Sequence, residues 1–254
     1  FFFAVESGPL LVFDFDGVLV DGMAEYWWSA RRAALSLDPG LRLAEQAPPG
    51  FALLRPHIHK GWEMVLMAAE LARADFDPAQ AAADYDRALA AALAERPWHP
   101  EQLQEALESV RRAAIADRVE DWLALHRFYP GVPERLRGLA AEGADWAVLT
   151  TKGGAFAARL LAAADLTPSA LYGHEQGSKP EVLGRLRGLG RPLWFVEDRR
   201  PTLERVRTTP GLEAVRCFLV CWGYLAPGDA DGLAAAGIGW LTPGAFAAPL
   251  ADWP

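Results

Sequence analysis

The pattern of hydrophobic and polar positions changes twice along the chain. Residues 10–13 are a short, continuous apolar run, which predicts a strand buried on both faces of a parallel sheet. Between residues 22 and 128 no stretch is typical of a strand, and apolar residues recur at three- and four-residue spacing instead. Beyond residue 128, short apolar runs alternate with helical patterns. This order predicts an α/β protein with a helical insert after its first strand.

The insert is expected to be a domain of its own, since a structureless segment of that length is uncommon inside a compact domain. Its periodicity and its proline and glycine stops predict helices at residues 24–37, 61–74, 78–95 and 100–126. Residues 22–128 would then be a helical domain with a small core, and residues 1–21 and 129–254 would form the α/β domain.

The later part of the chain predicts the rest of the sheet. Strands are expected at residues 146–149, 170–172, 192–196 and 215–224, and helices at residues 133–142, 155–164, 180–188 and 202–207. Strands that alternate with helices indicate a doubly wound parallel sheet.

Charge and length narrow the range of partners. The 254 residues carry a net charge of −8, which argues against nucleic acid because phosphate backbones are held by an excess of Lys and Arg. A small phosphorylated substrate needs only a local positive pocket. No apolar run approaches the roughly 18 residues of a membrane span, and the apolar opening of residues 1–5 is too short for a signal peptide.

Cys217 and Cys221 are the only cysteines. In a strand they would lie about 13 Å apart, and a disulfide needs Cα atoms within about 7 Å. Both are therefore expected to be buried free thiols, which favours a cytoplasmic protein.

The first predicted strand ends in candidate chemistry. Asp14 and Asp16 lie two residues apart, so the period of a strand places them on one side. The two carboxylates repel each other unless a cation is present, and Mg²⁺ is a natural partner for carboxylates near a phosphate. Gly17 permits a sharp turn and the close approach of a ligand. Taken alone, the pattern is equally typical of a surface Asp pair before a turn.

Polar residues also follow the other predicted strands, at the edge of the sheet where ligands of α/β proteins bind. Thr150, Thr151 and Asp198 end strands, and Lys179 opens a helix. Each has an ordinary alternative: Thr150 and Asp198 could cap helices, and Lys179 could be a solvated lysine. Their joint occurrence in this order makes coincidence improbable.

With these residues in place, the chain resembles the haloacid dehalogenase superfamily, chiefly its phosphatases. The matching segments are Asp14-Phe15-Asp16-Gly17-Val18, Val148-Leu149-Thr150-Thr151-Lys152, Gly177-Ser178-Lys179-Pro180-Glu181 and Phe195-Val196-Glu197-Asp198. The helical insert is similar to the family's C1-type cap, in a layout like that of phosphoglycolate phosphatases.

The resemblance implies a Mg²⁺-dependent phosphomonoester hydrolase that acts on a small phosphorylated metabolite. Asp14 would be the nucleophile that forms an aspartyl-phosphate, and Asp16 the general acid and base. Thr150 and Lys179 would bind the phosphoryl group. Mg²⁺ would be held by the Asp14 side chain, the Asp16 backbone carbonyl and Asp198. Gly17 and Thr151 would lie against the substrate.

The fourth motif departs from the family pattern. Thr202 stands where a later acid is often found, and Glu197 or Glu204 could supply the missing carboxylate. Otherwise the metal site would carry fewer charges, and its affinity for Mg²⁺ could be low. Arg199 and Arg200 are also unusual there, and salt bridges with Glu204 are favoured over substrate binding.

The cap is expected to select the substrate, because it would close over the strand ends and exclude water. Arg55, His57 and Lys60 could bind a carboxylate or a second phosphate of the substrate, although a solvated helix start is the commoner meaning of such a cluster.

Three other functions stay open. A non-catalytic binding protein of the same superfamily would explain the altered fourth motif. A phosphomutase would keep the same core residues, so only its products would distinguish it. A haloacid dehalogenase needs neither a metal nor a second acid, so Asp16 and Asp198 count against it.

Overall fold

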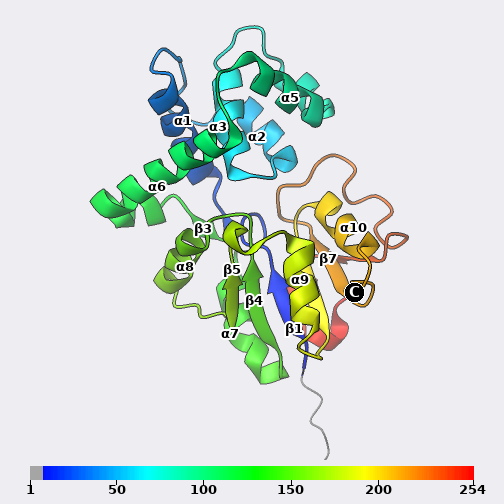
Figure 1. The fold of residues 1–254 in the computed structure, drawn as a ribbon. Helices are drawn as coiled ribbons and strands as arrows, with labels where there is room; N and C mark the ends of the chain where they lie inside the picture. Colours follow the sequence, from blue (N-terminus) through cyan, green and yellow to red (C-terminus); the bar gives the residue numbers. More distant parts are fainter. Residues whose placement is uncertain (1–7) are drawn as a thin grey trace, which may run out of the picture. The chain divides into compact units, whose positions relative to one another are not determined.

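The computed structural model describes residues 8–254, which form two compact units (Figure 1). One unit is an α/β domain that contains residues 8–21 and Phe128–Pro254, and the other is the helical segment Gly22–Arg127. The interpretation of residues 1–5 lies outside the described residues.

The α/β unit contains a six-stranded parallel sheet in the order β5-β4-β1-β6-β7-β8. The strands are β1 (Leu10–Phe13), β4 (Asp145–Leu149), β5 (Ala170–Tyr172), β6 (Leu193–Glu197), β7 (Arg216–Val220) and β8 (Ile238–Leu241). In the register of the sheet, Phe13 pairs with Val148 of β4 and with Val196 of β6. The residues that follow these three strands therefore lie at one edge, and the predicted α/β fold is confirmed.

Helices flank the sheet, as Figure 1 shows for α9 and α10. They are α7 (Val132–Gly138), α8 (Gly154–Ala163), α9 (Lys179–Arg187), α10 (Arg200–Thr208) and α11 (Pro243–Ala247), with short 3₁₀ turns at Leu139–Glu142, His174–Gln176 and Leu250–Asp252.

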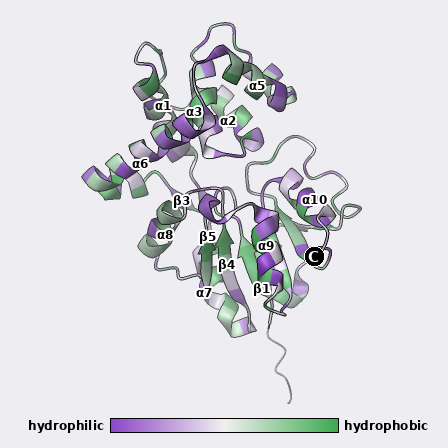
Figure 2. Ribbon diagram, viewed as in Figure 1, coloured by the Kyte–Doolittle hydropathy of each residue, from purple (hydrophilic) through white to green (hydrophobic). Residues whose placement is uncertain are grey.

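The two faces of the sheet bury different side chains. Val12 and Phe195 belong to an apolar cluster that also contains buried residues of α9 and α10. Neighbouring positions in the strands point to the opposite face. There Phe13 packs edge-on against Phe246 of α11, and Phe218 packs against Trp253. Burial on both faces explains why the strands are nearly all apolar (Figure 2).

The last part of the sheet differs from the prediction. β7 ends at Val220 and does not continue to residue 224. The backbone N–H of Tyr224 donates to the Asp198 carboxylate and not to a neighbouring strand. β8 was not predicted, since a glycine interrupts its four residues. Both cysteines are free, as predicted, but only Cys217 is buried.

The helical unit contains α1 (Met23–Leu37), α2 (Pro49–Leu54), a 3₁₀ turn (Arg55–His57), α3 (Gly61–Glu70), α4 (Pro78–Ala83), α5 (Tyr85–Glu95) and α6 (Pro100–Leu123). The helix predicted at residues 78–95 was wrong in one respect, because the non-helical backbone of Asp84 (φ −143°, ψ 68°) divides it. Two short strands, β2 (Val20–Asp21) and β3 (Arg127–Phe128), form a two-stranded sheet where no strand was expected. None of the helices within residues 8–254 has both the length and the apolar character that crossing a membrane requires.

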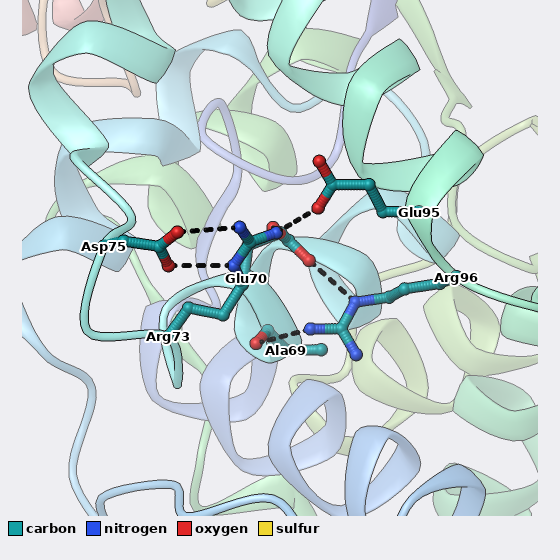
Figure 3. Close-up of polar contacts among 6 residues, drawn as sticks. All are labelled: Ala69, Glu70, Arg73, Asp75, Glu95 and Arg96. Atoms are coloured by element: carbon teal, nitrogen blue, oxygen red, sulfur yellow. Dashed lines mark hydrogen bonds and ion pairs between the residues drawn. The ribbon is translucent and has the colours of Figure 1, made fainter.

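Charged side chains are buried among these helices in opposite-charge pairs. The Glu25 carboxylate of α1 accepts two hydrogen bonds from Arg111 of α6, at 2.7 and 2.8 Å. Glu70, at the end of α3, accepts from Arg96 at 2.7 Å and from Arg73 at 3.0 Å (Figure 3). The contact between the Arg111 guanidinium and the Glu25 carboxylate is two-fold, hence strong and directional, so it fixes how α1 packs against α6.

Candidate active site

Asp14 is the first residue after β1. Its side chain is buried, and Lys179 Nζ lies 2.7 Å from Asp14 Oδ1. Its backbone N–H donates to Val196 of β6. Because β1 is central in the sheet, Asp14 lies between the ends of its two neighbouring strands.

Gly17 makes the turn that follows, with φ at +89°. A Cβ atom there would lie 1.9 Å from Oδ2 of Asp198, far inside contact distance. The turn therefore needs glycine for two reasons, a left-handed backbone and the close approach of Asp198. The sequence predicted that Gly17 permits a sharp turn. It also predicted a close approach at this position, but not that the approaching group is Asp198.

Glu197 and Asp198 end β6 and are both buried. Glu197 Oε1 accepts hydrogen bonds from the backbone N–H groups of Asp198 and Arg199, and Lys179 Nζ lies 2.5 Å from Glu197 Oε2. Asp198 Oδ2 accepts from the backbone N–H of Tyr224 at 2.8 Å. The N-cap of α10 is Arg199, so the alternative in which Asp198 caps that helix is wrong.

Lys179 is the first residue of α9. Ser178 and Glu181 form a capping box that fixes the start of this helix. The Lys179 side chain is only 7% exposed and lies between the carboxylates of Asp14 and Glu197. The solvated-lysine alternative is therefore wrong.

Thr150 ends β4 and is buried. Its hydroxyl oxygen accepts a hydrogen bond from the backbone N–H of Lys152 at 3.0 Å. The N-cap of α8 is Gly153, so Thr150 does not cap that helix. Thr151 is half-buried beside it.

Two residues near this edge had no predicted role. Lys152 is buried, with Nζ 3.3 Å from Oδ1 of Asp16, which is itself partly exposed. Tyr224 contacts Asp198 through its backbone and donates its hydroxyl to Asp21 at 2.7 Å. The position of Lys152 directly after two strand-end threonines was a usable signal, whereas nothing local in the sequence marks Tyr224.

The edge carries more negative than positive charge. Burial, together with the negative charge of Glu197, raises the pKa of Asp14 from 3.8 to about 7, although the ammonium of Lys179 opposes the shift. Burial alone would lower the pKa of Lys179, but the carboxylates of Asp14 and Glu197 outweigh it and raise that pKa. Lys179 therefore stays cationic, and among the described residues its single charge lies between two carboxylates.

A divalent cation fits this deficit. Asp14, Glu197 and Asp198 each offer a carboxylate oxygen, and the three oxygens lie within 4.8 Å of one another. Oxygen donors of this kind suit hard cations such as Mg²⁺. The side chain of Asp16 is not in this group, and the part that its backbone carbonyl would take in holding a metal stays a prediction.

Glu204 is placed differently. It pairs with Arg200 at 2.7 Å on α10, and its side chain is 45% exposed. Of the two acids that could replace the one missing at Thr202, the structure puts Glu197 in the acidic cluster and gives Glu204 to a helical salt bridge. The preference for a salt bridge between Arg200 and Glu204 is confirmed.

Arg55, His57 and Lys60 belong to the helical unit. The Arg55 guanidinium lies 4.8 Å from the centre of the Tyr26 ring, and the His57 ring stacks on Tyr85. Lys60 is exposed at the N-cap of α3. Their role in substrate binding stays a prediction.

Several solved structures have the same fold. A "predicted phosphoglycolate phosphatase" from Haemophilus somnus 129PT has a TM-score of 0.61 and 21% identity, with 96% of each chain covered. A "predicted phosphatase" from Clostridium acetobutylicum has a TM-score of 0.59 and 16% identity, and covers 92% of this chain and 93% of its own. A haloacid dehalogenase-like family hydrolase from Streptococcus pneumoniae has a TM-score of 0.57 and 15% identity, and covers 93% of this chain and 94% of its own.

Sequence comparison identifies the family. No match was found among curated proteins. Residues 9–200, which contain β1, the helical unit and the strand ends of β4 and β6, match the family of haloacid dehalogenase-like hydrolases. The chain belongs to the haloacid dehalogenase-like hydrolases.

Proposed function

We propose that this hydrolase is a phosphatase that removes the phosphoryl group from a small phosphorylated metabolite with the help of Mg²⁺. The observation that carries the proposal is the buried Asp14 carboxylate, in contact with Lys179 and next to Glu197 and Asp198. Similar folds described as phosphatases support it.

Asp14 is proposed as the nucleophile. Its carboxylate oxygen forms a bond to phosphorus while the bond from phosphorus to the ester oxygen breaks, which yields an aspartyl-phosphate. Asp16, two residues further on, gives a proton to the departing oxygen. In the second half of the reaction Asp16 takes a proton from water, and that water releases phosphate and regenerates Asp14.

Thr150 and Lys179 are proposed to hold the phosphoryl oxygens. Thr150 has a buried hydroxyl whose oxygen accepts from Lys152, which leaves the hydroxyl proton free to be donated. Lys179 brings a permanent positive charge next to Asp14, where negative charge gathers in the transition state. Gly17 and Thr151 would line the same edge.

The Asp14 and Asp198 side chains and the Asp16 backbone carbonyl are proposed to hold Mg²⁺, with Glu197 close by. When bound, the ion supplies positive charge that offsets the phosphate and the clustered carboxylates.

We propose that the helical unit is a C1-type cap that selects the substrate. Arg55 and Lys60 carry positive charge and His57 can acquire it, so a substrate with a second anionic group would suit them. The two free cysteines favour the cytoplasmic location that we propose.

Phosphate release from p-nitrophenyl phosphate and a panel of phosphorylated metabolites tests the proposal, with Mg²⁺ or EDTA and with Asp14→Asn as the control. We expect turnover that needs Mg²⁺ and falls at least about 10⁴-fold in Asp14→Asn, since the nucleophile is lost. Product analysis separates hydrolysis from transfer within the substrate, as in a mutase. A folded wild-type protein that is inactive on the whole panel would favour the non-catalytic alternative.

A further inference from the structure

Lys152 is the second buried lysine at the active edge, and the proposed mechanism gives it no role. Its side chain is 1% exposed, and its Nζ lies 3.3 Å from Oδ1 of Asp16. Its backbone N–H donates to the hydroxyl oxygen of Thr150 at 3.0 Å. One residue therefore contacts two of the proposed catalytic side chains, Asp16 at the end of β1 and Thr150 at the end of β4.

Burial of this lysine calls for an explanation. Lysine is almost never fully buried without a partner, because removing its charge from water is costly. A loop that only joined β4 to α8 could keep its lysine in solvent at no such cost. Lys152 instead brings its charge to a carboxylate, and groups buried in this way are concentrated at functional sites.

Each of the two buried lysines contacts a different aspartate. Lys179, from α9, contacts Asp14 at 2.7 Å, and Lys152, from the end of β4, contacts Asp16 at 3.3 Å. Asp16 is less buried than Asp14, and it lies beyond the end of the strand. The ion pair with Lys152, from the neighbouring strand end, restricts the orientations of its carboxyl group.

We propose that Lys152 is a positioning residue that holds the Asp16 carboxyl group in the orientation from which it passes a proton to the leaving oxygen of the substrate. This role rests on the proposed phosphatase function and deepens it. The side chain acts through Asp16, so its loss affects the steps in which Asp16 transfers a proton, the first of which is protonation of the leaving oxygen. The backbone contact with Thr150 does not depend on the side chain and persists in a variant.

This role is tested by how the effect of a Lys152 substitution on kcat/KM depends on the leaving group of the substrate. p-Nitrophenolate is a weak base that departs without a proton, whereas the alkoxide of an alkyl phosphate must be protonated as it leaves. The value of kcat/KM reports the first phosphoryl transfer, in which Asp16 is the acid. The substrates are p-nitrophenyl phosphate and the best alkyl phosphate of the metabolite panel.

We expect Lys152→Met to lower kcat/KM for the alkyl phosphate about 10- to 100-fold, a part of the full effect of general acid catalysis, and to change it less than about 3-fold for p-nitrophenyl phosphate. Lys152→Arg, which keeps the charge, should restore most of the loss. Asp16→Asn should show the same selectivity with a larger loss, and adding Lys152→Met to Asp16→Asn should cost little more.

Equal losses on both substrates, or no loss on either, would overturn the role of Lys152 while leaving the phosphatase function intact. If Lys152→Met does not fold, Lys152→Gln and Lys152→Arg make the same comparison, and equal behaviour of these two on the alkyl phosphate would overturn the role of the charge. A wild-type protein inactive on both substrates would overturn the phosphatase function itself, and the role of Lys152 with it.

Discussion

Both units of this protein bury charged side chains, but they balance them differently. In the helical unit, Glu25 is matched by Arg111, and Glu70 by Arg73 and Arg96 (Figure 3). In the α/β unit, three carboxylates lie within 4.8 Å of one another, and Lys179 alone contacts two of them.

This difference in the pairing of buried charges distinguishes a structural role of such residues from a functional one. A buried ion pair with good geometry offsets its own desolvation and fixes the arrangement of the helices that carry it. An unbalanced cluster destabilises the fold unless something else supplies the missing charge. The raised pKa of Asp14 is the measurable sign of that imbalance. Buried charged residues therefore hold helices together in one unit, and in the other they offer carboxylate oxygens that could hold a cation.

The largest expected effect comes from breaking the buried ion pair between Glu25 and Arg111 in the helical unit. Arg111→Met leaves Glu25 buried without its guanidinium partner, and we expect the free energy of unfolding to fall by about 3–5 kcal/mol. Urea unfolding followed by circular dichroism measures the change. Catalytic assays below the unfolding transition should show intact chemistry, since Arg111 is not among the proposed catalytic residues.

Arg112→Met is the matched control for that prediction. Arg112 is the next residue on the same helix and pairs with Glu105 and Glu108, but its side chain is 51% exposed. Its loss should change stability by less than about 0.5 kcal/mol. The double variant Glu25→Gln/Arg111→Met should recover much of the stability, because no charge then remains buried. Equal effects of the two arginines would contradict the assignment of Arg111 to the structural network.

Asp14→Asn tests the α/β unit, where buried negative charge is in excess, and its expected effect on stability is the second largest. The folded, metal-free protein keeps a proton on Asp14 up to about pH 7, whereas the ordinary carboxyl of the unfolded chain loses it near pH 3.8. Because the folded state binds the extra proton, its stability falls as pH rises from about 4 to about 7. Asn carries no such proton. In EDTA at pH 8, the variant should therefore be more stable than the wild type, by about 4 kcal/mol at most.

The measurement is urea unfolding of the wild-type protein and of Asp14→Asn in EDTA at several pH values from 5 to 8. The advantage of the variant should shrink toward pH 5, and Mg²⁺ should reduce it by stabilising the wild type. A constant advantage at all pH values would show that Asp14 is not the group that titrates.

The sequence predicted the parts of the site that depend on strand ends. Asp14, Thr150 and Asp198 each follow an apolar run, and the parallel register brings the ends of such runs to one edge. The α/β fold followed from the alternation of strands and helices, since that pattern is local along the chain.

The contacts that decide burial could not be predicted, because they join residues far apart in the sequence. Lys179 was as compatible with solvent as with the site until its partners were known, and Glu197 is 18 positions away from it. Tyr224 was predicted to belong to a strand, but its backbone N–H donates to Asp198, which lies 26 positions earlier. The break at Asp84 lies within an alanine-rich helical stretch that has no proline or glycine to mark it.

The smallest expected effect concerns which acid completes the cluster, a question that the sequence left open between Glu197 and Glu204. Glu197 is buried among the possible cation ligands, whereas Glu204 is a half-exposed partner of Arg200. Glu197→Gln keeps the shape and can still accept from Lys179, but it removes one negative charge. We expect the Mg²⁺ dissociation constant to rise about 10-fold, as for residues that support a metal site. Glu204→Gln should change it less than about 2-fold, since exposed ion pairs contribute little.

The rise of the unfolding temperature with Mg²⁺ concentration measures both constants without an activity assay. At a Mg²⁺ concentration well above both dissociation constants, the 10-fold change corresponds to a loss of about 1.4 kcal/mol of Mg²⁺-dependent stabilisation. A larger effect of Glu204→Gln than of Glu197→Gln would reverse the assignment and make charge at the helix, rather than burial at the strand end, the feature that retains the cation.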